Sequence, residues 1–259
     1  PYMNELTGIS TLEKQLITLS GMDEIIIVKG DSESDPHVKE ELGRSAANYL
    51  KTIITSDVTI AVTGGTTLAS VANYIEPFGK HRCLFVPARG GTGEQVEIQA
   101  NTIVAKMAER EKGDYRLLHV PDPLSESVYQ TLIAEPAIQE TLQLIHDAEI
   151  VLHGLGDALT IARRRKSSKQ TMELLTKHVA VGEVFGYYFN ERGEIVHQVR
   201  TIGIQLDQLD DRKTVITIAG GKAKARALKA FLQFGISNVL IIDEAAAEEM
   251  IKLYERSIS

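Results

Sequence analysis

The chain has 259 residues, of which 43% are hydrophobic and 24% charged, an ordinary globular composition for one large α/β domain or two small ones. Its net charge of −7 argues against direct DNA binding by this chain, because nucleic-acid-binding domains are usually basic. No run approaches the roughly 18 consecutive apolar residues of a membrane span. No basic start precedes an apolar run, so we expect neither a membrane segment nor a signal peptide.

Two further features concern the origin of the chain and its compartment. The chain begins at Pro1 rather than at a methionine, so we expect a processed chain or a piece of a longer protein. The single cysteine, Cys83, cannot form an internal disulfide. It lies in an apolar run, which favours a buried, unreactive thiol over a reactive one. These features predict a cytoplasmic protein.

Strand-like and helix-like patterns alternate along the chain. Leu12, Leu16 and Leu19 stand at helical spacing and predict a first helix over 6–19. Short β-branched runs predict strands over 25–28, 58–62, 83–86, 115–119, 150–152, 215–218 and 239–242. Helical patterns follow over 34–50, 68–75, 96–109, 124–132, 137–145, 167–177, 223–234 and 244–255. Ser34 is the predicted cap of the second helix.

The order of these elements predicts the fold. Continuous β-branched runs separated by helices indicate parallel strands that are buried on both faces. We therefore predict one α/β domain with a doubly wound, Rossmann-like parallel sheet. Two further strands, 184–189 and 195–199, flank Asn190-Glu191-Arg192-Gly193, a sequence typical of a hairpin turn. They predict a small antiparallel annexe beside the main sheet.

Four glycine-containing loops follow predicted strands, at 63–67, 88–93, 153–157 and 219–222. In open parallel sheets, ligands bind at the carboxyl ends of the strands, where backbone N–H groups and helix N-termini point outward. The convergence of four such loops therefore predicts an anion site, and it does so more strongly than any single loop.

The first of these loops carries Gly64, Gly65, Thr66 and Thr67. The glycines let the backbone approach an anion closely, and the threonines add hydroxyl donors at the positive end of a helix. No Gly-Lys-Ser/Thr follows, so the loop is not a nucleotide P-loop. The alternative is an ordinary strand-to-helix turn in which Thr66 is only the N-cap.

Three further positions supply positive charge. Arg89 precedes Gly90-Gly91-Thr92-Gly93 and could hold a phosphate in a bidentate manner, or lie on a mobile surface loop. Lys222 and Lys224 open a helix, where they oppose its dipole; this suggests a nearby anion, the alternative being solvated lysines. The run Arg163-Arg164-Arg165-Lys166 could bind a second phosphate or a nucleic acid, or be a solvated loop.

Other residue types give weaker indications. Glu183 could accept hydrogen bonds from sugar hydroxyls or lie in solvent at the start of a strand, and the residues alone favour neither. We interpret His153 as a packing residue at a strand end rather than a base. The segment Gly154-Leu155-Gly156-Asp157 lacks the third glycine of a dinucleotide fingerprint. We predict no metal site and no catalytic nucleophile, since metal-ligand spacings and a Gly-x-Ser-x-Gly elbow are absent from the sequence.

Six motifs occur in a fixed order: Val62-Thr63-Gly64-Gly65-Thr66-Thr67-Leu68-Ala69, Pro87-Ala88-Arg89-Gly90-Gly91, Gln99-Ala100-Asn101, His153-Gly154-Leu155-Gly156-Asp157-Ala158, Gly182-Glu183-Val184-Phe185-Gly186 and Ala219-Gly220-Gly221-Lys222-Ala223-Lys224. Together they resemble the effector-binding domain of SorC-type sugar-responsive transcriptional regulators. The resemblance covers essentially all of 1–259. It implies a fold akin to sugar-phosphate isomerases and deaminases, no cofactor, and a bound sugar phosphate, with fructose 1,6-bisphosphate as the expected ligand.

The resemblance also implies roles for individual residues. Thr66 and Thr67 would donate to one phosphate with Lys224 beside them, and Arg89 and Arg164 would hold the other. Gln99 and Glu183 would contact the sugar hydroxyls. The expected effector-binding set is Gly64, Gly65, Thr66, Thr67, Arg89, Gly91, Gln99, Arg164, Glu183 and Lys224.

The implied function is effector sensing and oligomerisation, as a dimer or tetramer, in a bacterial repressor of glycolytic genes, without enzymatic activity. Such regulators carry an N-terminal helix-turn-helix that we do not find in 1–259, so operator DNA would be bound by another part of the parent protein and released when sugar phosphate binds. One alternative is a sugar-phosphate isomerase or deaminase that uses Asp157 or Glu183 for proton transfer. Another is a nucleotide-binding module, suggested by the arginine run and Gly154-Leu155-Gly156.

Overall fold

A computed structural model describes residues 2–91, 95–210 and 213–258 of the protein. Thr92 and Gly93 of the expected anion-binding loops lie outside the described residues. Among those described, seven parallel strands form the main sheet in the order β1-β11-β10-β5-β2-β3-β4. Their bounds are β1 Glu24–Val28, β2 Val58–Val62, β3 Cys83–Pro87, β4 Asp114–Tyr115, β5 Ile150–His153, β10 Thr214–Ile218 and β11 Val239–Asp243.

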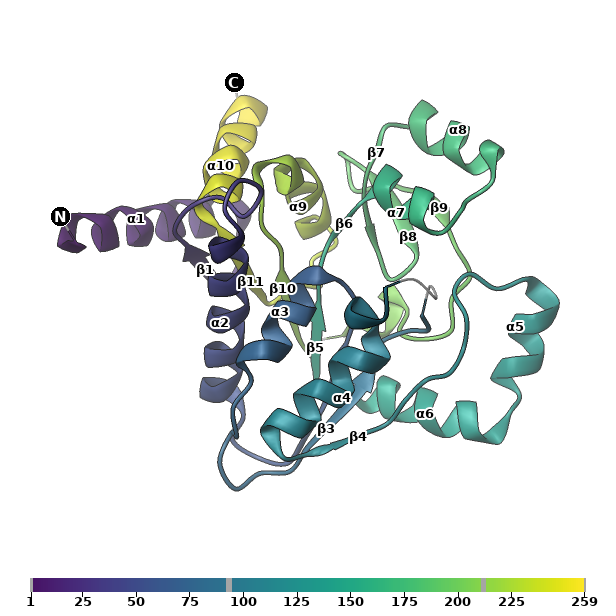
Figure 1. Ribbon diagram of the computed structural model, residues 1–259. Coiled ribbons are helices and arrows are strands. Elements are labelled where there is room, and N and C mark those ends of the chain that lie inside the picture. Colours follow the sequence, from purple (N-terminus) through teal and green to yellow (C-terminus); the bar gives the residue numbers. More distant parts are fainter. Residues whose placement is uncertain (1, 92–94, 211–212, 259) are drawn as a thin grey trace.

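Helices cover both faces of this sheet (Figure 1). One face carries α2 Pro36–Ile53, α3 Thr66–Tyr74 and α4 Ala100–Glu111. The other carries α1 Tyr2–Ser20, α6 Pro136–Asp147, α9 Ala225–Leu232 and α10 Glu244–Ile258. The predicted doubly wound fold is therefore confirmed.

Strand β11, in the interior of the sheet between β1 and β10, shows why the apolar runs are continuous. All five of its residues are buried. Leu240 and Ile242 pack toward one helical layer, whereas Val239 and Ile241 pack toward the other. A strand covered on both faces needs apolar side chains at odd and even positions alike.

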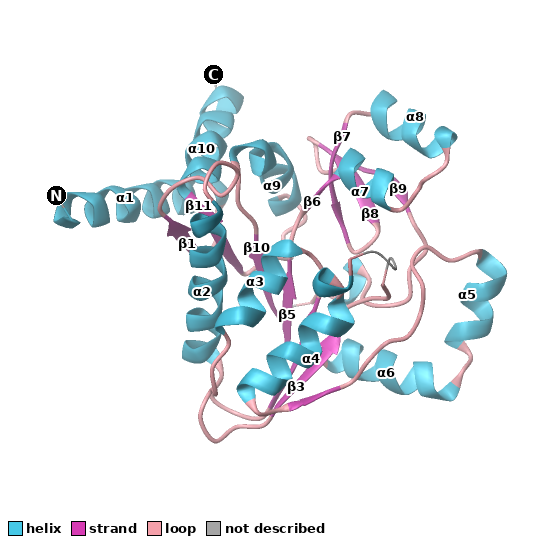
Figure 2. Ribbon diagram, in the orientation of Figure 1, coloured by secondary structure: helices cyan, strands magenta, loops and turns pink. Residues whose placement is uncertain are grey.

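A separate antiparallel sheet lies beside the main one (Figure 2). It consists of β6 Gly156–Asp157, β7 Ala180–Val184, β8 Tyr187–Asn190 and β9 Ile195–Gln198, with α7 Ala158–Arg164 and α8 Lys169–Lys177 packed against it. This sheet confirms the predicted annexe, including the turn after Asn190.

The prediction of a single strand over 184–189 is wrong, because these residues are divided between the end of β7 and the start of β8. Val184 pairs with Tyr187 across a tight turn at Phe185 and Gly186, whose φ angles are 51° and 93°. The Gly186 N–H donates to Glu183 Oε1 at 2.7 Å, and a Cβ on Gly186 would lie 2.8 Å from the Val199 carbonyl oxygen. Tertiary contacts therefore fix this turn within an apolar run that reads locally as one strand.

Several other element boundaries differ from the predicted ones. Asp35, not Ser34, caps α2, and it accepts a hydrogen bond from the His37 N–H. Pro36 follows it at the first helical position, where the fixed φ and missing N–H of proline are favourable. The predicted strand over 115–119 is reduced to β4. The predicted helix over 96–109 is interrupted at Gln99, between a 3-10 turn and α4.

The remaining elements complete the chain. Helix α5 spans Glu126–Ile133, and the 3-10 turns are η1 Val96–Ile98, η2 Leu206–Gln208 and η3 Lys222–Lys224. Among the described residues, we find no helix that is long and apolar enough to cross a membrane. The connection from β2 leads to β3 on one side, whereas β5 leads to β10 on the other. This reversal between adjacent strands creates a crevice at their carboxyl ends.

Candidate functional site

A cavity of about 430 Å³ lies at the carboxyl ends of β2, β3 and β5. All ten residues of the expected effector-binding set line it: Gly64, Gly65, Thr66, Thr67, Arg89, Gly91, Gln99, Arg164, Glu183 and Lys224. They come from the main sheet and from the annexe alike. The structure thus brings the ten positions together, while binding of a ligand to them stays a prediction.

The loop between β2 and α3 forms one wall of the cavity. Gly65 precedes the helix with φ of 123°, and its N–H donates to the Ile98 carbonyl at 2.8 Å. A Cβ on Gly64 would lie 2.7 Å from the same carbonyl oxygen, so a larger residue could not stand there without a shift. Thr66 is the first helical residue rather than the N-cap, so the alternative interpretation of this loop is wrong in that detail.

The donors at the start of α3 are available to a ligand. Thr66 is exposed and Thr67 is 8% exposed, and both line the cavity. Neither threonine side chain forms a hydrogen bond with any residue that the structure describes. The first N–H groups of a helix lack intrahelical partners and carry partial positive charge. This end of the cavity therefore offers hydroxyl and backbone donors to an anion.

Lys224, at the end of η3, contributes a half-buried positive charge. Burial lowers the pKa of its ammonium group, the neighbouring Lys39 and Arg164 lower it further, and Glu33 and Asp243 oppose them. Lys224 forms no salt bridge within 2–91, 95–210 and 213–258. An anion in the cavity would compensate this charge. Lys222, in contrast, is exposed, pairs with Glu249 at 3.6 Å and does not line the cavity.

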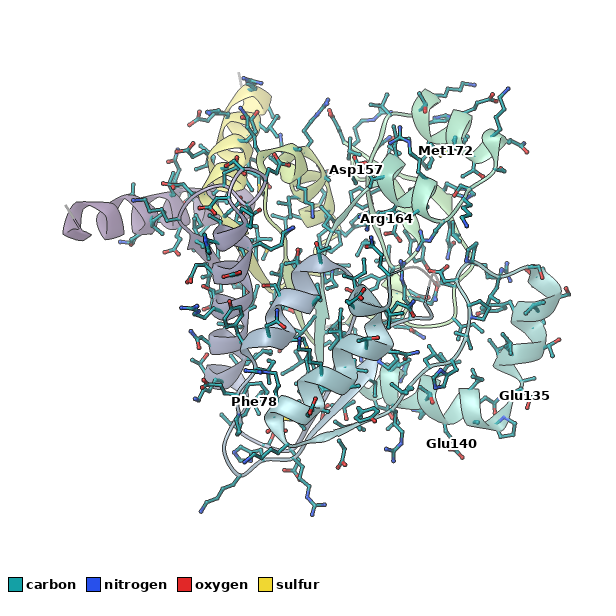
Figure 3. The ribbon with its side chains drawn as sticks, in the orientation of Figure 1. Phe78, Glu135, Glu140, Asp157, Arg164 and Met172 are labelled. Atoms are coloured by element: carbon teal, nitrogen blue, oxygen red, sulfur yellow. The ribbon has the colours of Figure 1, made fainter. Side chains whose placement is uncertain are left out.

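The arginine run divides into residues with different environments. Arg164, the last residue of α7, is exposed at the cavity, and Asp157 precedes the first residue of the same helix (Figure 3). Arg163 is exposed and lies away from the cavity lining, whereas Arg165 lines the cavity from a buried position. Only part of the arginine run is therefore solvated. The sequence did not reveal this division, because α7 is too short for its hydrophobic periodicity to show which of its residues are buried.

A buried charge network joins the two sheets. Glu183 Oε1 accepts hydrogen bonds from Arg89 Nη1 at 2.9 Å and from Arg165 Nη2 at 3.1 Å. Asp122 Oδ2 lies 3.6 Å from Arg89 Nη2 and 3.2 Å from Arg165 Nη2. Arg165 Nη1 also donates to the Tyr188 hydroxyl at 2.9 Å. Two positive and two negative side chains balance one another, as buried charges require.

Sequence reasoning missed Asp122 and gave Arg165 no specific place. Asp122 lies in a loop before α5 that has no motif, and it reaches the network only through tertiary folding. Arg89, expected to bind phosphate, is already paired with two carboxylates. A guanidinium group has five N–H donors, so this pairing leaves donors for a ligand. Arg164 and Lys224 are the lining cations without a salt bridge among the described residues.

Glu183 and Gln99 place oxygen atoms at the cavity. The three hydrogen bonds to the Glu183 carboxylate all reach Oε1, whereas Oε2 lies 3.5 Å from where a Cβ on Gly156 would stand. Burial raises the pKa of this carboxyl group, but Arg89, Arg165 and the Gly186 N–H together lower it to about 2. Gln99 Oε1 lies 3.2 Å from the corresponding Cβ position of Gly91.

His153 lies behind the cavity and has a structural environment. Its Nδ1 is 2.9 Å from the Gly154 carbonyl oxygen, and its Nε2 is 2.8 Å from Thr217 Oγ1. The carbonyl can only accept, so Nδ1 carries the proton and Nε2 accepts from the threonine hydroxyl. Phe185 and Phe231 lie against the ring, with centroids at 5.0 and 5.1 Å. This agrees with a packing residue at a strand end.

The buried His153 is expected to make stability depend on pH. Burial lowers its pKa to about 4, whereas an unfolded histidine titrates near 6.5. Between these values the unfolded chain binds a proton that the folded chain excludes, so the free energy of unfolding falls as pH drops from 7 to 4. At about 1.4 kcal/mol for each pKa unit, the loss approaches 3 kcal/mol. Urea denaturation at a series of pH values measures it.

The matched variants for this prediction are His153→Gln and His119→Gln, the latter at an exposed histidine. His153→Gln is expected to remove most of the dependence between pH 4.5 and 6.5, even if it lowers stability at pH 7. His119→Gln is expected to retain it. Equal slopes in the wild type and in His153→Gln would contradict the assignment.

Other chemistry at the cavity is limited. Asp157 Oδ1 accepts a hydrogen bond from the Thr160 N–H at 2.8 Å and so caps α7. Among the described residues, no group of three or more His, Cys, Asp or Glu side chains is arranged to hold a metal ion. The thiol of Cys83 is buried, and burial raises its pKa to about 12.

Comparison with known proteins places this geometry in a family. Residues 4–252 match a family model described as "Putative sugar-binding domain". The chain is 50% identical to the central glycolytic genes regulator of Priestia megaterium over 252 residues, which cover 96% of this chain and 74% of the relative. It is 44% identical to the regulator of the same name from Bacillus subtilis over 251 residues, with the same two coverages.

A solved structure supports the same assignment. It is described as a "putative SorC family transcriptional regulator" from Enterococcus faecalis and superimposes with a TM-score of 0.87 at 43% identity. The match covers 93% of this chain and 99% of that one. The family match over most of the chain, the two relatives and the shared fold agree with the six ordered motifs. The chain belongs to the family of sugar-binding domains found in SorC-type transcriptional regulators.

Proposed function

We propose that the chain senses a sugar bisphosphate, fructose 1,6-bisphosphate being the first candidate, and that it does so for a transcriptional repressor of glycolytic genes. The observation that carries the proposal is a pair of cations, Arg164 and Lys224, that line one cavity of an otherwise acidic chain and form no salt bridge with the residues that the structure describes. Both line this cavity together with Thr66, Thr67 and Arg89, which supply further donors. Two phosphate groups match two such positions.

The proposed contacts follow from this arrangement. Thr66, Thr67 and Lys224 bind one phosphate, and Arg164 with Arg89 binds the other. The Glu183 carboxylate accepts hydrogen bonds from the sugar hydroxyls, and the Gln99 amide accepts or donates them. The ligand would then touch both the main sheet and the annexe. If the ligand binds more tightly to one relative placement of the two sheets than to another, it shifts the population toward that placement. This shift would change the operator affinity of the parent protein.

The carboxylates of the cavity support sensing rather than catalysis. Proton transfer at a sugar carbon needs an acid or base with a pKa near the working pH. Glu183 is held ionised, with its pKa lowered to about 2, and Asp157 is engaged in capping α7. We therefore propose a domain without enzymatic activity that acts in the cytoplasm as part of a dimeric or tetrameric regulator, whose operator contacts lie outside this chain.

Thermal unfolding in the presence of ligand tests the proposal. A ligand at 100 times its dissociation constant adds about 2.7 kcal/mol of stability, which corresponds to a shift of roughly 5–10 °C for a domain of this size. We expect that shift with fructose 1,6-bisphosphate and none with unphosphorylated fructose. Arg164→Ala should reduce it, and Arg163→Ala, at the exposed neighbour outside the cavity, should not. A shift with a nucleotide but with no sugar phosphate would contradict the proposed ligand.

A further inference from the structure

Glu183 is in a position that would ordinarily favour the neutral acid. Its side chain is 5% exposed on β7, and Gly182 and Val184 beside it are also buried. A carboxyl group in such surroundings takes up a proton unless fixed positive charge or hydrogen-bond donors compensate it. As a neutral acid it would lose acceptor capacity toward the cavity. To keep Glu183 ionised, the chain must therefore supply a cation that stays beside the carboxylate both with and without a bound ligand.

Arg89 and Arg165 both bind Glu183, but they differ in freedom. The Arg89 side chain is 15% exposed and belongs to the loop after β3, so a ligand anion can compete for it. The Arg165 side chain is 0% exposed and is held by Asp122, Glu183 and Tyr188. Its guanidinium carbon also lies 5.7 Å from the centroid of the Tyr188 ring. Arg165 therefore stays with Glu183 if Arg89 turns toward a phosphate.

The geometry at the carboxylate shows what this achieves. Arg165, Arg89 and the Gly186 N–H all donate to Oε1, so that this oxygen is saturated. The remaining oxygen, Oε2, is next to the cavity wall at Gly156. We infer that Arg165 is a positioning residue for ligand recognition: it fixes the Glu183 carboxylate in its charged form so that Oε2 accepts hydrogen bonds from hydroxyl groups of the ligand. This inference rests on the proposed function.

Several charged or titratable groups surround Glu183 and enter its titration. They are Arg89 from the loop after β3, Asp122 from the loop before α5, His153 from β5, Arg165 from the end of α7 and Tyr188 from β8. The two arginines are the positive members. Removing Arg165 leaves Arg89 alone against two carboxylates, so the charged form of Glu183 becomes less favourable.

The first measurement needs no ligand. The side-chain carboxyl of Glu183 is followed by carbon-13 NMR between pH 4.5 and 8 and is assigned by its loss in Glu183→Gln. In the wild type we expect no titration in this range. In Arg165→Met, which keeps length but not charge, we expect a titration within it. A wild-type Glu183 that titrates between pH 4.5 and 8 overturns the inference, whether or not the variant folds.

The second measurement is affinity for fructose 1,6-bisphosphate, expressed at each pH as the ratio of variant to wild type, so that titration of the ligand phosphates cancels. For Arg165→Met we expect this ratio to fall at least 10-fold further as pH drops from 8 to 5. The double variant with Glu183→Gln should show no such pH dependence, and Arg165→Lys should restore the wild-type profile. Arg163→Met, at the exposed neighbour, is the matched control.

The outcomes separate the inference from the proposed function. A loss of affinity in Arg165→Met that is equal at every pH would indicate a merely structural arginine and overturn the inference. If the wild type binds no sugar phosphate, the proposed function fails, whereas the carboxyl titration still decides whether Arg165 holds Glu183 in its charged form.

Discussion

Replacing Asp243 with alanine is expected to lower the free energy of unfolding by about 3–5 kcal/mol. The carboxylate is fully buried at the end of β11. Its Oδ2 accepts hydrogen bonds from Ser32 N at 2.8 Å and Gly221 N at 2.7 Å, and its Oδ1 accepts from Ala246 N at 3.0 Å. Alanine would leave three N–H groups without their acceptor, and each buried donor left unsatisfied costs about 1–3 kcal/mol. Urea denaturation at pH 7 measures the change.

The matched control is Asp23→Ala, at an exposed aspartate before β1 that is expected to change stability by less than about 0.5 kcal/mol. Asp243 also holds the backbone of Gly221, whose φ is 101°, immediately before the turn that carries Lys224. Asp243→Ala should therefore weaken ligand binding in addition to stability. Equal stabilities of the two variants would show that the three hydrogen bonds contribute little.

The main sheet could be predicted because its signals are local. Strand β11 is buried on both faces, so the run Val239-Leu240-Ile241-Ile242 is apolar at every position and marks a parallel strand. Strand β4 is the counterexample. It is a two-residue edge strand with both residues exposed, so nothing in its burial selects for a long β-branched run, and the predicted strand over 115–119 was too long.

The positions around the cavity could be predicted for a different reason. Gly64 allows the backbone to approach Ile98 closely, and Gly65 adopts a φ of 123°, and both requirements appear directly in the residue type. Asp122 has no comparable signal. Its place depends on meeting Arg165 from 43 residues away in the chain, and that meeting exists only in the folded structure. The different environments of Arg163, Arg164 and Arg165 could not be predicted for the same reason. The three residues are identical in type, and only the geometry of the helix end distinguishes them.

Replacing Lys224 with methionine is expected to separate affinity from stability. Lys224 is half-buried without a salt bridge among the described residues. Partial burial, together with the nearby Lys39 and Arg164, lowers the pKa of its ammonium group, so the charge is unfavourable in the ligand-free fold. Removing it should leave the free energy of unfolding unchanged or raise it by up to about 1 kcal/mol. Affinity for fructose 1,6-bisphosphate should fall on the order of 100-fold, because a charge-assisted contact to phosphate is lost.

Calorimetric titration and urea denaturation of the same samples measure the two effects of Lys224→Met. Lys222→Met is the control, since that lysine stands two residues earlier in the same turn, is exposed and pairs only at the surface with Glu249. It should change neither quantity appreciably. If Lys224→Met binds as tightly as the wild type, the proposed phosphate position at Lys224 is wrong. The cavity would then suit a monophosphate held by Arg164. A variant that loses both affinity and stability would instead show that Lys224 supports the fold, for example through its charge interactions with Glu33 and Asp243.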